Sequence, residues 1–158
     1  MPELAGIHHV KIPVTDLSRS LDWYGRVFGL KVTLKFPDAD GVERGAAGEM
    51  PGLGPVLVAF RENPQAARGC QGFDPVSFAV QGRADVEAWA AHLDAQGVAH
   101  SPLIEASIGW LLVFNDPDGL ELHLYSWAAH GNDHSARPGY GRSVTSTATG
   151  TDLEGSTS

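Results

Sequence analysis

The chain has 158 residues, of which 42% are hydrophobic, so it is long enough for one compact domain with its own core. Its formal net charge of -8 at pH 7 would repel nucleic acid and other polyanions, and no apolar run approaches the roughly 18 to 20 residues that cross a membrane. One cysteine, Cys70, excludes an intrachain disulfide, and the amino terminus lacks the pattern of a signal peptide, so a cytoplasmic location is expected.

The first half of the chain predicts a strand, a helix and three more strands. An alternating strand over residues 6–14 leads into a helix over 18–28, which Asp16 or Ser18 caps. Three strands then follow, separated by turns rich in Pro, Gly and Asp, at 30–36, 41–49 and 55–62. Residues 63–73 lack periodicity, and we interpret them as a linker.

The second half repeats this order. A strand over 75–81 precedes a helix over 83–96, and three strands follow near 98–104, 109–115 and 119–126. Each half therefore has the order βαβββ. Because the two halves repeat one supersecondary unit, equivalent positions can be compared between them.

Alternation assigns the strand faces. In the first strand Val10, Ile12 and Val14 face the helix, which leaves His9, Lys11 and Pro13 on the other side. The equivalent strand of the second half turns Pro75, Ser77 and Ala79 away from its helix.

The last hairpin is defined by the turn sequence Asp116-Pro117-Asp118-Gly119. If Pro117 and Asp118 are its two central residues, the facing pairs are Phe114 with Glu121, Leu112 with His123, and Trp110 with Tyr125; a bulge would shift this register by one. This register places a ligand wall of Trp110, Leu112 and Phe114 beside the polar residues Glu121, His123 and Tyr125. Such a surface is too apolar for open water, so a ligand or the other module is expected to cover it.

Two stretches carry a family resemblance: HVKIPVTDL at 9–17, followed by Trp23-Tyr24 and Phe28-Gly29, and FNDPDGLELHLY at 114–125. They resemble the vicinal oxygen chelate superfamily, which includes glyoxalase I, extradiol dioxygenases, fosfomycin-resistance enzymes and bleomycin-resistance proteins. The likeness covers about residues 6–127. It implies an α+β fold in which βαβββ modules 6–62 and 74–127 form a curved mixed sheet around a cleft, within a single domain of residues 1–128. Such sites are often completed across a two-fold interface, so a homodimer is expected.

In metal-dependent members of that superfamily, four side chains project into the cleft. The matching positions here are His9, its repeat counterpart Pro75, His123, and either Val58 or Leu57, depending on the spacing used. Only the two histidines can bind a metal. A divalent ion (Zn, Ni, Mn or Fe) is therefore expected to be absent or weakly held by His9 and His123, with Glu121 near enough to be a third ligand.

Three functions remain open. The first is a metal-free protein that binds a small aromatic molecule through Lys11, Val58, Pro75, Ser77, Trp110, Leu112 and Phe114. The second is a metal-dependent lyase, isomerase or dioxygenase that uses His9, His123 and Glu121. The third is a metal-free enzyme with general acid–base chemistry by His9, Glu121, His123 and Tyr125. We place the first slightly ahead of the others.

The last residues, 129–158, are rich in Gly, Ser and Thr, and they predict a polar, mostly disordered tail. Tyr140 could fasten the first part of this tail to the body. His130 and His134 could fold back onto a metal, but the Gly, Asn and Asp between them disfavour a helix, and we favour a mobile tail.

Overall fold

The computed structural model describes residues 1–134, 136, 138–139 and 141–144. Its elements, in chain order, are β1 (His9–Val14), α1 (Leu17–Phe28), β2 (Lys31–Pro37), β3 (Glu43–Glu49), β4 (Leu57–Glu62), α2 (Pro64–Gly69), β5 (Ser77–Val80), α3 (Arg83–Ala95), β6 (Ile104–Glu105), β7 (Gly109–Asn115), β8 (Glu121–Ala129) and β9 (Arg142–Ser143). The repeated order βαβββ and the α+β class are confirmed.

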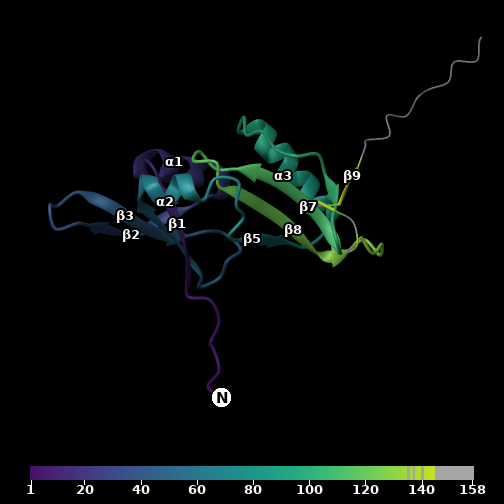
Figure 1. The fold of residues 1–158 in the computed structure, drawn as a ribbon, viewed down its shortest axis with the longest axis horizontal. Helices are drawn as coiled ribbons and strands as arrows, with labels where there is room; N and C mark the ends of the chain where they lie inside the picture. The colour runs from purple at the N-terminus through teal and green to yellow at the C-terminus, as the bar shows by residue number, and fades with distance from the viewer. Residues whose placement is uncertain (135, 137, 140, 145–158) are drawn as a thin grey trace, which may run out of the picture.

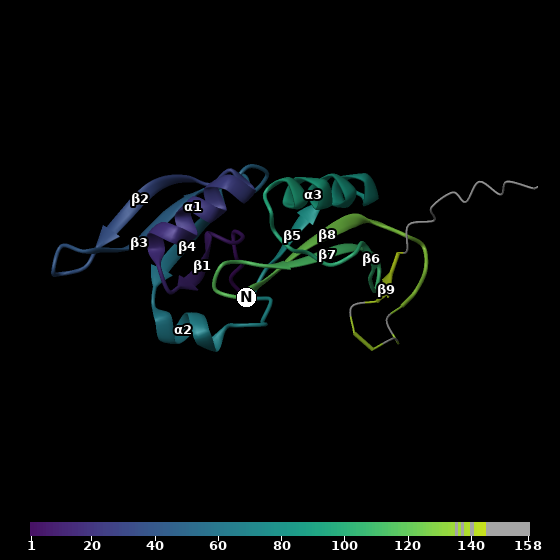
Figure 2. The same cartoon turned by 90° about the horizontal axis from the view of Figure 1, so that it is seen from above.

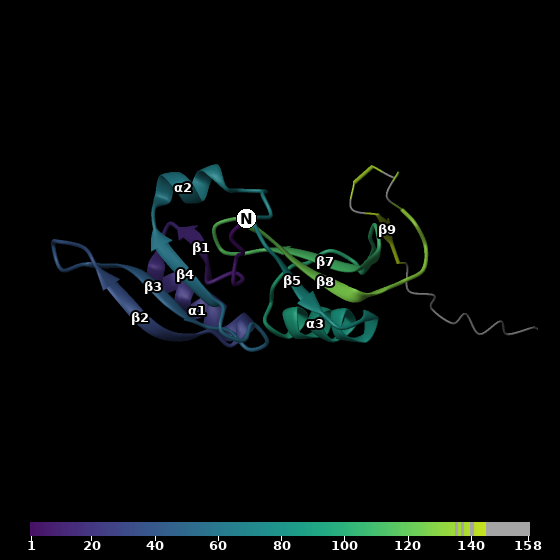
Figure 3. The same ribbon diagram turned by 90° about the horizontal axis from the view of Figure 1, so that it is seen from below.

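The strands form two mixed sheets, ordered β1-β4-β3-β2 and β5-β8-β7-β6-β9. In each sheet the first strand of the module pairs in parallel with the fourth, as β1 with β4 and β5 with β8. Figure 1 shows α1 and α3 on the same side of the two sheets. The hairpin of β2 and β3 projects from one end of the molecule (Figure 2). The opposite faces of the two sheets, the open faces, carry neither α1 nor α3, as the view from below shows (Figure 3).

The two modules share one hydrophobic core, centred on α1. Asp16 caps α1 by accepting a hydrogen bond from the Arg19 N–H, and Gly29 ends it in the left-handed conformation at φ +70°. The Phe28 ring reaches the second module, with centroids 5.4 Å from Phe78 and 5.9 Å from Phe114. Because these contacts cross between modules, the two halves fold as one body.

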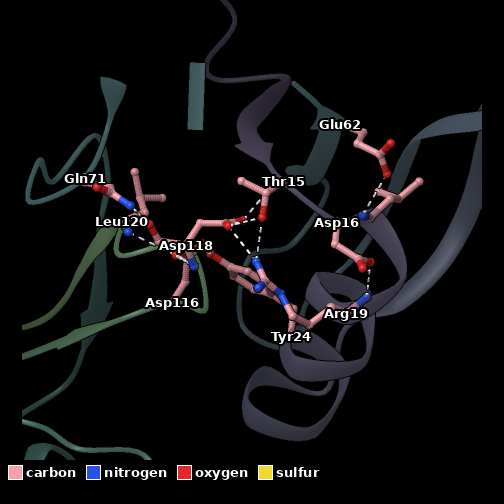
Figure 4. Close-up of polar contacts among 10 residues, drawn as sticks. Thr15, Asp16, Arg19, Tyr24, Glu62, Gln71, Asp116, Asp118 and Leu120 are labelled. Carbon is pink, nitrogen blue, oxygen red and sulfur yellow. Dashed lines mark hydrogen bonds and ion pairs between the residues drawn. The ribbon is translucent and has the colours of Figure 1, made fainter. Parts of the chain in front are cut away.

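A polar junction also joins the modules, through the turn between β7 and β8 (Figure 4). Asp118 accepts a hydrogen bond from the Thr15 N–H at 2.9 Å and another from the Thr15 hydroxyl, and it pairs with the Arg19 guanidinium at 2.5 Å. The Tyr24 hydroxyl donates to Asp116 at 3.1 Å. The turn between β7 and β8 therefore holds the second module against α1. The sequence analysis did not predict this role.

Burial decides how the junction groups titrate. Burial raises the pKa of Tyr24 well above 10.0, and the nearby Asp116 carboxylate adds to this rise. Burial also raises the pKa of Asp116 above 3.8, although the backbone N–H groups that donate to its carboxylate lower that pKa in part. Burial also opposes ionisation of Asp118. Hydrogen bonds from Thr15 and Arg19 outweigh it there, so the pKa of Asp118 lies below 3.8.

The linker prediction was wrong for residues 64–69, which form α2. Asn63 caps this helix by accepting from the Ala66 N–H at 3.0 Å, and Pro64 stands at its start, where proline is favoured. The tail also differs from expectation, because β9 pairs with β6 and His134 is buried. Tyr140 and residues 145–158 lie outside the described residues. No helix among the described residues is long and apolar enough to cross a membrane.

Candidate functional site

The open face of the first sheet carries two of the predicted residues. In the parallel pair of β1 and β4, His9 lies beside Leu57 and Lys11 beside Ala59. Both His9 and Lys11 are exposed, as alternation predicts. The His9 Nδ1 lies 3.0 Å from the Nδ1 of His8, its neighbour in the chain. His9 therefore projects from the open face.

A hollow of about 150 Å³ lies over this face. Its walls include Lys11, Phe36 and Arg61, and small side chains such as Ala59 leave its floor low. A cavity of this size holds about one aromatic ring. Arg61 is held by Asp38 at 2.7 Å, and the hydrogen bonds from Arg61 and Arg44 lower the pKa of Asp38. The hollow thus combines two cationic groups with an aromatic side chain.

The second sheet contributes a histidine between two carboxylates. His123 is 5% exposed, its Nε2 lies 2.7 Å from Glu121 Oε1, and its Nδ1 lies 3.4 Å from Asp74 Oδ2. Ser77 of β5 is the register partner of His123 and is exposed, and so is Pro75 just before that strand. The imidazole is therefore held on both sides by acceptors, an arrangement that can move a proton or orient a polar ligand.

The predicted register of the last hairpin was wrong by one residue. Val113 faces His123 and Phe114 faces Leu122, because three residues, Pro117 to Gly119, form the loop and Gly119 takes φ +83° at its end. The supposed ligand wall therefore turns toward the helices, with Phe114 against α1 and Trp110 against α3. Leu112 and Phe114 are 0% and 2% exposed in the core, and Trp110 packs against that core under the Arg83 guanidinium. The open face carries Leu111 and Val113 instead.

Val58 was also placed on the wrong face. It pairs with Val10 and is fully buried in the core, so the position beside His9 belongs to Leu57, the alternative that follows from constant repeat spacing. An apolar leucine thus stands where a fourth-strand metal ligand would project.

Tyr125 lies on the same strand face as His123, but its hydroxyl is engaged by the backbone. The N–H groups of Ile108 and Gly109 donate to it at 3.2 and 3.4 Å. These bonds hold the start of β7 against β8. The predicted catalytic role of Tyr125 stays a prediction, and the structure gives its hydroxyl a structural partner.

Two of the four family positions, Leu57 and Pro75, offer no ligand atom, and the described polar contact of His9 is with His8. Another group of side chains could hold a metal ion. Among the described residues, three metal-ligand atoms lie close together only at Glu105, His130 and His134. The expected third ligand, Glu121, instead binds His123.

A larger crevice of about 400 Å³ lies between α1 and α3, lined by Phe28, Trp89 and their neighbours. It opens on the helix side, whereas His9, Lys11 and His123 belong to the sheet faces. The crevice also has polar groups, Arg26 and His92, but the His92 Nε2 is already held 2.9 Å from the Val27 carbonyl. We therefore place the binding site at the hollow, where Lys11 and Arg61 stand beside apolar surface.

Sequence reasoning missed Arg61, Phe36 and Asp74. Asp74 is the repeat counterpart of His8 and precedes the strand that pairs with β8, so the repeat could have indicated it. Arg61 and Phe36 meet Lys11 only through the pairing of four strands, β1, β4, β3 and β2. Alternation within a single strand carries no signal of that meeting.

Comparison with known proteins gives the following likenesses. The family model described as the Glyoxalase/Bleomycin resistance protein/Dioxygenase superfamily matches residues 6–124. A curated relative, the putative ring-cleaving dioxygenase MhqA of Bacillus subtilis (strain 168), is 29% identical over 125 residues, which are 75% of this chain and 39% of that protein. The chain therefore spans well under half of this relative.

Two solved structures are similar in fold. A glyoxylase/bleomycin resistance protein/dioxygenase domain from Frankia sp. EAN1pec aligns with a TM-score of 0.60 and 27% identity, covering 78% of this chain and 98% of that one. TnmS3, an antibiotic binding protein from Streptomyces sp. CB03234, aligns with a TM-score of 0.65 and 20% identity, covering 80% and 98%.

Proposed function

Because the chain belongs to the Glyoxalase/Bleomycin resistance protein/Dioxygenase superfamily, we propose that it binds a small anionic aromatic molecule on the open face of its first sheet. The observation that carries this proposal is the hollow lined by Lys11, Arg61 and Phe36. A ring would stack on its low floor and against Phe36, and the cationic groups would bind a carboxylate or similar anion. The structural likeness to an antibiotic binding protein is in keeping with this role.

Binding without a cleft metal is part of the proposal. Leu57 and Pro75 remove two of the four ligand positions, and the carboxylates of Glu121 and Asp74 already hold His123. Such a protein would act in the cytoplasm, where the single free thiol of Cys70 would stay reduced.

A second candidate is a metal-free acid–base enzyme, favoured by the 2.7 Å contact between His123 and Glu121. The carboxylate orients the imidazole, which would then exchange a proton with a substrate atom. A ligand that binds to Lys11 and is released unchanged supports the binding protein, whereas turnover that is lost in His123→Ala supports the enzyme.

Replacing Lys11 by Ala is expected to weaken the binding of an aromatic carboxylate by about tenfold or more, because a charge-assisted hydrogen bond is lost. The measurement is calorimetric titration with benzoate and 2-naphthoate, and neutral benzamide tests the need for charge. Lys35→Ala is the matched control, because Lys35 alternates onto the opposite face of the same sheet and pairs with Glu43 at 2.8 Å. If neither anion binds, or if both variants bind equally well, the proposal is wrong.

Metal content separates the metal-dependent enzyme from this proposal. Elemental analysis of tag-free protein would be compared with His9→Ala and His123→Ala. A divalent metal that is lost in both variants would replace the present proposal by a metal-dependent reaction. We expect neither variant to change the metal content.

We also propose that the open faces are covered in a homodimer. Leu34 and Phe36 lie on the same face of β2 and are 47% and 45% exposed, and a contiguous exposed apolar patch marks a site of association. Leu34→Asp is expected to shift the sedimentation of the protein from dimer to monomer. Val42→Asp is the control, since Val42 is equally exposed at the turn before β3. A monomeric wild type would contradict the dimer.

A further inference from the structure

A group of two imidazoles and a carboxylate lies outside the open faces. Glu105 belongs to β6, and His130 and His134 follow β8. One donor atom of each lies within 4.8 Å of the other two. Glu105 and His134 are 4% and 8% exposed, so the group is largely removed from water.

Backbone hydrogen bonds hold residues 130–134 against the turn between β6 and β7. The His130 N–H donates to the Ile108 carbonyl at 3.1 Å, and the His134 N–H donates to the Ser107 carbonyl at 3.4 Å. Further along the chain, β9 pairs with β6, with Arg142 opposite Glu105. The two histidines therefore lie beside the strand that carries Glu105.

The contacts of His130 fix its tautomer, and a metal at its Nδ1 would replace one hydrogen bond from the backbone. Its Nε2 lies 2.8 Å from the Ala106 carbonyl, which only accepts, so Nε2 carries the proton and Nδ1 has the lone pair. Metal-binding histidines usually donate their second N–H to such a carbonyl, which fixes the ring. The Asn132 N–H donates to this Nδ1 at 3.0 Å.

His134 has a nitrogen whose hydrogen-bonding capacity is unmet. Its Nε2 lies 2.6 Å from Glu105 Oε1, while its Nδ1 is buried and has no hydrogen-bond partner among the described residues. A buried polar atom without a partner costs stability. The Glu105 carboxylate accepts a further hydrogen bond, at 2.8 Å, from the side-chain amide of Asn132.

We propose that Glu105, His130 and His134 bind one divalent transition-metal cation, which fastens residues 130–134 to β6 of the second sheet. Two imidazoles and one carboxylate form a donor set typical of Zn²⁺ or Fe²⁺. Small side-chain rotations would replace the hydrogen bonds by metal–ligand bonds. The burial of the group indicates a structural site. The proposal is independent of ligand binding at Lys11, because the two sites share no residue.

The test is calorimetric titration of the full, tag-free chain with Zn²⁺ after removal of metals by EDTA and dialysis. We expect one Zn²⁺ per chain, and a loss of affinity of at least about tenfold in His130→Ala and in His134→Ala. His100→Ala is the matched control, because His100 also lies 3.2 Å from a carboxylate, that of Asp94, and should leave binding unchanged.

Thermal unfolding gives a second measurement. Zn²⁺ is expected to raise the Tm of the wild type, His9→Ala and His123→Ala, but not that of His134→Ala. If His134→Ala does not fold, Glu105→Gln, which keeps the shape of the side chain and an oxygen acceptor, provides the same test. A wild type that binds no Zn²⁺ would overturn the proposal. So would binding that disappears in His9→Ala and His123→Ala but persists in His134→Ala.

Discussion

Phe114→Ala is expected to lower the free energy of unfolding by about 3–5 kcal/mol, the usual cost of removing a buried aromatic ring. The Phe114 ring is 2% exposed, and its centroid lies 5.9 Å from that of Phe28 and 6.4 Å from that of Trp23. These rings belong to α1, so the variant also weakens the contact between the modules. Urea unfolding at pH 7 measures the change.

The control for this variant is the neighbouring residue on the other face of β7. Val113 is half-buried on the open face, and Val113→Ala should cost only about 1 kcal/mol. A Phe114→Ala protein that is nearly as stable as the wild type but loses ligand affinity would instead support the register with Phe114 in the ligand wall.

Asp118→Asn is expected to destabilise the protein by about 1.5–3 kcal/mol at pH 7, because the charge-assisted hydrogen bonds at the junction are weakened or lost. The side chain of Asp118 is 5% exposed, whereas that of Arg19 is 47% exposed, so solvent screens the ion pair and the hydrogen bonds from Thr15 should carry much of the effect. Asp40→Asn serves as the control. Asp40 pairs with Arg44 at the surface, where such a pair contributes little.

The stability difference between wild type and Asp118→Asn should depend on pH in a defined direction. The folded-state pKa of Asp118 lies below its ordinary value of 3.8, so its contribution is fully present above pH 3.8 and is lost as the pH falls through the folded-state pKa. The raised pKa of Asp116 acts in the opposite sense. The charge of Asp118 is the smallest of its causes and burial is the largest, so most of the rise is present in both proteins. Unfolding measured from pH 7 down through pH 3.8 and further into acid should show the two curves converging below pH 3.8. Curves that stay parallel throughout the acid range would contradict the assignment.

Much of the fold could be predicted from local pattern. The alternation in β1, the Asp16 cap and the glycine that ends α1 each depend on a few neighbouring residues. The repeat then extended the βαβββ order to the second half. The same alternation placed His9 and Lys11 on the open face of the sheet, because successive side chains of a strand point to opposite sides.

The wrong predictions concerned which face of a strand a side chain occupies. They arose where a difference of one residue, in the length of a turn or in the spacing of the repeat, decides that face. The choice between a two-residue and a three-residue loop at 117–119 moved Trp110, Leu112 and Phe114 from the open face to the core, since a shift of one exchanges the faces of a strand. A separate difference of one residue, in the spacing between the two repeats, placed Val58 where Leu57 belongs.

The sequence by itself determined the two-module fold, the superfamily and the two histidines that face away from the helices, because periodicity and short motifs are local properties of the chain. Only the tertiary structure decided what these residues meet. Lys11 reaches Arg61 and Phe36 through strand pairing, Asp118 reaches α1 across the modules, and His134 reaches Glu105 through a chain that returns to the sheet edge. Such meetings depend on register and on contacts between distant segments, which local sequence patterns do not specify.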